Sequence, residues 1–226
     1  MVHRWSGALL AGVMWLSGSL SARAFETPGL DEAVARYSQG AIVKVREGLG
    51  DRATAYQRAE LLAAEALVLS SDERQGEAVQ LARRAVAALL EAIRAREDLV
   101  AAHFLLFKLY GQLSAADWTF ALKTRDPLQY LREHAPDDRR TAIAEALNSL
   151  FTPRIFGGDP QAAVKRLEGL HAKAYDPETA NLLAVAYEQT GQFAKARAVA
   201  DSILQRNPRD RSAQALRDRL AKREAG

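Results

Sequence analysis

Apolar residues recur at intervals of three and four positions along most of the chain, and this spacing constrains the fold more than any other feature. It places apolar side chains on one face of an α-helix, whereas a half-buried strand requires strict alternation of apolar and polar residues. No alternating stretch of any length occurs in the sequence. Ala, Leu, Arg and Glu dominate the composition, and β-branched residues are sparse. The sequence therefore predicts an all-α fold.

Turn and capping residues divide this pattern into successive helices. Asp51 and Asp72 are the predicted N-caps of the second and third helices. Pro153 is expected to end a helix near Phe151, because the residue before a proline is disfavoured in helical conformation. The predicted helices cover about 30–45, 51–69, 72–93, 99–113, 115–124, 128–133 and 137–151, with further helices that begin near Pro160, Pro177 and Phe193 and a polar terminal helix over 210–223.

The first 24 residues have the pattern of a secretory signal peptide. A charged start precedes an apolar run from Trp5 to Leu20, and the tripeptide Ala22-Arg23-Ala24 follows it. The pattern predicts cleavage after Ala24, which leaves residues 25–226 as a single helical-repeat domain in the periplasm. The alternative is a retained N-terminal anchor, but the apolar run is shorter than the roughly 20 strongly apolar residues of a spanning helix.

Charge and cysteine content limit the classes of partner. The formal net charge of the whole chain is +3, and the segment before residue 25 carries two of the arginines and no acidic residue. The remaining domain is nearly balanced in charge, so we expect no nucleic-acid partner. The chain contains no cysteine. It therefore has neither disulfides nor a lipidated N-terminal cysteine, and we expect contact with a membrane only through a partner.

A repeat is visible near the C-terminus. The residues at its packing positions, in chain order, are Ala180, Leu183, Ala184, Tyr187, Gly191, Phe193, Ala196, Ala200 and Pro208. Their spacing resembles that of the tetratricopeptide repeat from 177 to 210, followed by a capping helix over 211–223. Weaker halves of repeats occur at 85–92, 103–110 and 163–170. The resemblance implies an α-solenoid of antiparallel helix hairpins that binds a partner on its concave face.

In that family the first helix of each hairpin lines the concave face of a right-handed superhelix. The resemblance therefore implies partner-binding positions between the packing residues, namely Phe104, Lys108, Glu178, Asn181, Val185, Glu188 and Gln189. Trp118 is a further candidate, because tryptophan is enriched at interaction hot spots. Its other interpretation, which is the more frequent one for such a residue, is that it closes a core.

One loop suggests a second hypothesis. The segment from Leu150 to Pro160 interrupts the repeat, and its Pro-x-x-x-Gly-Gly-Asp-Pro form resembles a loop of the T component associated with tripartite periplasmic transporters. That resemblance implies a transporter-associated helical protein with a small ligand held between hairpins. The first hypothesis is a periplasmic interaction scaffold for a peptide or protein.

Residues that would support catalysis do not form a recognisable motif. His103, His134 and His171 lie on separate segments without metal-ligand spacing. Gly157-Gly158-Asp159-Pro160 lacks the lysine of a phosphate-binding loop, and we interpret it as a turn with an N-cap and a proline at the first helical position. We therefore predict no enzyme activity, no metal site and no cofactor.

Overall fold

The computed structural model describes residues 25–224, and all regular structure in this range is helical. No strand occurs among these residues, which confirms the predicted all-α fold. The predicted signal peptide, residues 1–24, lies outside the described residues. Within 25–224, no helix combines the length and the apolar character that crossing a membrane requires.

The N-terminal part contains two short helices and an antiparallel hairpin. These elements are α2 (Leu30–Ala35), α3 (Gln39–Leu49), the 3-10 turn η1 (Gly50–Arg52), α4 (Ala55–Ser71) and α5 (Gln75–Arg94). The single helix predicted over 30–45 is wrong, because Tyr37 adopts a positive φ of 50° and Ser38 caps a new helix. The predicted caps are also wrong. Thr54 rather than Asp51 caps α4, and Asp72 follows the end of α4 instead of starting α5.

The helices that follow agree more closely with the prediction. They are α6 (Leu99–Leu113), α7 (Thr119–Lys123), α8 (Arg125–His134), α9 (Arg139–Phe151), the 3-10 turn η2 (Arg154–Phe156), α10 (Pro160–Lys173), α11 (Pro177–Gln189), α12 (Phe193–Arg206) and α13 (Arg211–Glu224). The expected starts at Pro160, Pro177 and Phe193 and the end at Phe151 are confirmed. Pro127 lies between the helices predicted over 115–124 and 128–133, but it falls in the first turn of α8, where its missing N–H costs no hydrogen bond.

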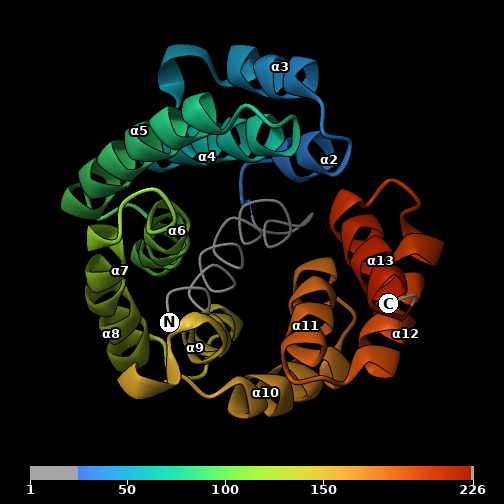
Figure 1. Cartoon of the computed structure of the whole chain (residues 1–226). Helices are drawn as coiled ribbons and strands as arrows, with labels where there is room; N and C mark the ends of the chain where they lie inside the picture. Colours follow the sequence, from blue (N-terminus) through green and yellow to red (C-terminus); the bar gives the residue numbers. More distant parts are fainter. Residues whose placement is uncertain (1–24, 225–226) are drawn as a thin grey trace.

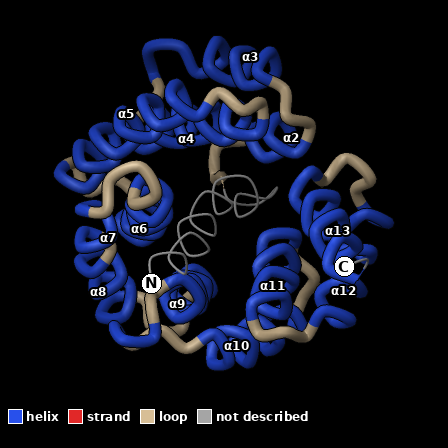
Figure 2. The backbone as a smooth tube through the Cα atoms, in the orientation of Figure 1, coloured by secondary structure: helices blue, strands red, loops and turns tan. Residues whose placement is uncertain are grey.

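The helices follow one another around a ring (Figure 1). Helices α6, α9 and α11 lie on its inner side, and α3, α8, α10 and α12 on its outer side. The loops that join them are short, so consecutive helices pack as antiparallel neighbours (Figure 2). The path turns so far that α13 returns close to α2.

The apolar core is divided into two clusters. One contains buried side chains of α2, α3, α4 and α5, one set of α6 residues and Phe120. The other contains Phe104 and Phe107 of α6 and the buried side chains of α8 through α13. Helix α6 is apolar around much of its circumference, as expected of a helix that packs on both sides. It therefore joins the two clusters.

Candidate functional site

The inner helices α6 and α11 are joined by an ion pair between two of the predicted partner-binding residues. Lys108 Nζ of α6 donates to Glu178 Oε1 of α11 at 2.5 Å, and each side chain is 3% exposed. Burial raises the pKa of Glu178, and the attraction of Lys108 opposes this effect. The Lys108 ammonium also lies 5.0 Å from the centre of the Phe104 ring. These three predicted site residues are thus in contact with one another.

Two more of the predicted residues link α11 to α13. Asn181 donates to Asp210 Oδ2 at 3.4 Å, and Glu188 accepts from Arg219 at 2.9 Å. The remaining two differ in accessibility, since Val185 is partly buried and Gln189 is exposed. The structure therefore gives most of the predicted positions a role in holding neighbouring helices together. Whether any of them binds a partner stays a prediction.

Trp118 lies outside the core. Its side chain is 71% exposed, and Leu122 on the same short segment is 68% exposed. The interpretation of Trp118 as a core residue is therefore wrong. Phe120 fills that role instead, since it is buried and lies 5.8 Å from the ring of Tyr110.

Aspartates cap the inner helices and the terminal helix. Asp98 caps α6, Asp138 caps α9, Asp176 caps α11 and Asp210 accepts from the first amides of α13. Their separations in the sequence are 40, 38 and 34 residues, and only the last equals the repeat length of about 34 residues. Carboxylates are favourable there because they face the positive end of the helix dipole. The step from Asp176 to Asp210 is a signal of the C-terminal repeat that our sequence analysis missed.

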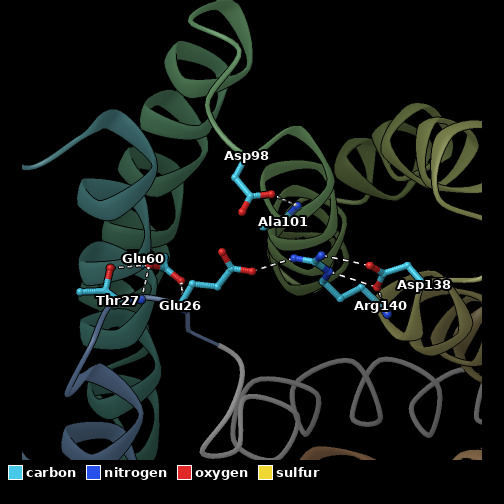
Figure 3. A network of polar contacts seen from close by, with 7 residues as sticks. All are labelled: Glu26, Thr27, Glu60, Asp98, Ala101, Asp138 and Arg140. Carbon is cyan, nitrogen blue, oxygen red and sulfur yellow. Dashed lines mark hydrogen bonds and ion pairs between the residues drawn. The ribbon is translucent and has the colours of Figure 1, made fainter.

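A buried carboxylate fixes the segment before α2 (Figure 3). Glu60 of α4 is 0% exposed and accepts from the Glu26 N–H at 2.5 Å, the Thr27 N–H at 3.0 Å and the Thr27 hydroxyl at 2.5 Å. Burial raises the pKa of Glu60, and these hydrogen bonds oppose that rise. Glu60 lies between apolar residues of α4, and our sequence analysis did not use this signal for the site.

The same segment is tied to α9. Glu26 accepts from Arg140 Nη1 at 2.7 Å, and Arg140 also donates to Asp138 Oδ2 at 3.0 Å (Figure 3). Burial raises the pKa of Glu26 to about 7, with further contributions from Asp98 and Glu60, while Arg140 lowers it. Residues 26 and 27 therefore connect α4 with α9 through polar contacts alone.

An open cavity lies beside this network. Its volume is about 340 Å³, and its lining residues are Glu26, Thr27, Thr54, Tyr56, Gln57, Glu60, Glu97 and Asp98. Burial raises the pKa of the Tyr56 phenol, as do the surrounding carboxylates. Within residues 25–224, no group of three or more metal-ligating side chains is placed to hold a metal ion. The cavity is open to solvent, and four of its lining residues are carboxylates, namely Glu26, Glu60, Glu97 and Asp98.

The predicted histidines lie in packing positions. The His103 ring stacks on Tyr130 with a centroid separation of 3.8 Å, and Tyr130 stacks on His134 at 4.1 Å. Burial lowers the pKa of His103, and His134 adds to that effect. His171 packs edge-on against Tyr175 at 5.9 Å.

The loop between α9 and α10 is tightly built. A Cβ at Gly158 would lie 1.7 Å from the carbonyl oxygen of Thr152, so only glycine fits this backbone. Asp159 accepts from the amides of Gln161 and Ala162, with Pro160 at the first helical position, which confirms the predicted turn and cap. The loop holds Ile155 and Phe156 exposed to solvent.

These hairpins, with α9 and α11 on the inner side of the ring, define a helical-repeat protein. Residues 157–220, which include α10 through α12 and most of α13, match the model of the tetratricopeptide repeat family. The C-terminal part of the chain is therefore similar to tetratricopeptide repeats. No curated protein and no solved structure matches it significantly.

Proposed function

We propose that the chain is a periplasmic scaffold that binds a peptide or protein partner on its inner helices. The observation that carries this proposal is the tetratricopeptide match over residues 157–220, because proteins of this family are generally interaction scaffolds without enzyme activity. The signal-peptide pattern of residues 1–24 supports the location. Near-balanced charge after residue 24 supports a protein partner over a nucleic acid.

The predicted residues best suited to test the binding face are those that are at least partly accessible and uncharged. Val185 and Gln189 belong to the inner helix α11, and Gln189 is exposed. Phe104 and Asn181 are less suitable, because both are buried and contact neighbouring helices. A change at either of them is expected to alter packing as well as binding.

The experiment is an affinity capture from periplasmic extract with residues 25–226 as bait. We expect one stoichiometric protein partner, and we expect Val185→Glu with Gln189→Glu to reduce its capture at unchanged helicity. Lys165→Glu is the matched control, since Lys165 is an exposed residue of the outer helix α10. Equal capture by all three baits would place the contact face elsewhere.

A bait that captures no protein would contradict the scaffold proposal. Native mass spectrometry of the same preparation then distinguishes the second hypothesis. A small molecule released on denaturation would support the transporter-associated protein that the loop at 150–160 resembles.

A further inference from the structure

The ring consists of two halves that share one helix. Each half has its own apolar cluster, and α6 contributes side chains to both. The first half ends at α2, and the second ends at α13. In Figure 1 these two ends lie next to each other, on the opposite side of the ring from α6. The apolar clusters remain separate there.

Arg211 makes the contact between the two ends. It is the first residue of α13, and its Nη1 donates to Asp72 Oδ1 at 2.8 Å and to the Ser71 carbonyl oxygen at 3.2 Å. Its guanidinium carbon lies 4.5 Å from the centre of the Tyr37 ring. These partners precede Arg211 by more than a hundred residues. We call this set, Tyr37, Ser71, Asp72 and Arg211, the seam.

The seam differs in chemistry from the interior of each half. The side chains of Arg211 and Asp72 are 45% and 39% exposed, so solvent and salt screen their attraction. A second ion pair between the halves is that of Glu26 with Arg140. Its side chains are 47% and 31% exposed. Each half is thus held by buried apolar side chains, and the halves are joined across the ring by polar, partly exposed contacts.

We propose that the ring opens at the seam, with α6 as the hinge and Arg211 as the latch. Packed helices retain their internal contacts when they move as rigid bodies, and the motion takes place where few contacts must break. The seam has that property, because its hydrogen bonds come from the Arg211 guanidinium and from Tyr37, which hydrogen-bonds the Arg211 backbone and the Ser212 side chain. Opening exposes the inner helices from the side. A role of this opening in partner access rests on the proposed binding function. The opening motion itself does not.

The test measures the distance across the seam by pulsed electron paramagnetic resonance on the full chain. The chain has no cysteine, so two introduced cysteines carry the only spin labels. Gly76→Cys in α5 is suitable because a Cβ there meets nothing within 4 Å. Ala215→Cys in α13 is suitable because that residue is exposed. Both sites are four residues from a seam residue.

We expect one narrow distance distribution at low salt and a second, longer population when Arg211→Ala is added. In the labelled protein that retains Arg211, raising the salt concentration should also produce the longer-distance population. This measurement does not depend on the folding of an Arg211 variant. Arg58→Ala is the matched control, because Arg58 forms an ion pair of similar exposure with Glu91 within one half. Its distribution should stay narrow.

Unchanged distributions for Arg211→Ala and for high salt would overturn the proposal. So would equal broadening by Arg58→Ala, since that would indicate general loosening. Arg211→Lys should restore part of the narrow population, because a lysine retains the charge opposite Asp72 without the stacking on Tyr37. These distances are measured without a partner. Failure of the capture experiment would therefore leave the distance result intact. Unchanged distances across the seam would likewise leave the capture result intact.

Discussion

Lys108 and Glu178 form a buried ion pair across 70 residues of sequence, with 2.5 Å between Nζ and Oε1. The pair joins two inner helices, α6 and α11, that are separated in the chain by α7 through α10. The pair therefore fixes the position of one repeat relative to another.

Removal of one partner of this pair should be more harmful than removal of both. Lys108→Met leaves the Glu178 carboxylate buried without its cation, at a cost of about 3–5 kcal/mol in the free energy of unfolding. Lys108→Met combined with Glu178→Leu should lose much less, because no buried charge remains. Urea unfolding of the single and double variants forms the measurement. Additive losses would contradict this interpretation.

Substitution of a repeat packing residue tests the register. Leu183 is 2% exposed, so Leu183→Ala should reduce the free energy of unfolding by about 2–5 kcal/mol. Gln189→Ala, on the exposed surface of the same helix, should change it by less than about 0.5 kcal/mol. The midpoint of chemical unfolding measures both. A Leu183→Ala protein as stable as Gln189→Ala would show that the repeat packs in another register.

Two glycines should respond in opposite directions to the same substitution. Gly158→Ala places a Cβ against the backbone of Thr152, and we expect a loss of about 1–3 kcal/mol as the loop shifts. Gly76→Ala meets open space within α5, and we expect a gain of about 0.5–1 kcal/mol from helix propensity. Thermal unfolding of the two variants side by side gives the signs. A shared sign would refute this account of the α9–α10 loop.

Glu26 should make stability fall as the pH rises. Its pKa is about 7 in the folded chain and 4.5 in the reference state, so between these values the folded chain holds a proton that the unfolded chain has released. The contribution is present in full below pH 4.5 and is lost as the pH rises toward 7. Glu26→Gln cannot ionise, so its unfolding midpoint should decline less over this window.

Two other buried carboxylates also contribute to the pH dependence, so the pH experiment compares the Glu26→Gln protein with the unsubstituted protein. Burial also raises the pKa of Glu60 and of Glu178, and both persist in the Glu26→Gln protein. The informative quantity is therefore the difference between the two pH profiles. Parallel profiles would show that Glu26 does not titrate in this range.

The elements predicted correctly from the sequence are those that depend on local interactions. Pro160 and Pro177 occupy the first turn of their helices, and Asp159 and Asp176 cap them, so neighbouring residues contain the whole signal. The break at Tyr37 was missed for the opposite reason. Apolar spacing continues through it, and only the positive φ of Tyr37 reveals the turn.

The candidate site was less predictable, because it depends on contacts between distant residues. The concave-face positions were chosen by their spacing on one helix, and spacing does not show that Lys108 meets Glu178 or that Asn181 meets Asp210. The network at Glu26 and Arg140 spans 114 residues and has no local pattern. The core interpretation of Trp118 was wrong because its residue type favours burial, while the short helix that follows it turns Phe120 inward.

The closed path of the helices explains how a single exposed arginine can hold the two ends together. Asp72 and Arg211 face each other because the intervening helices form a stiff frame, so their effective concentration is high without any new contact. Between separate molecules, the same ion pair would dissociate at once. An insertion that altered the curvature of any one repeat would separate the ends without changing either residue. The meeting of Asp72 and Arg211 is thus a property of the accumulated bend of the described helices.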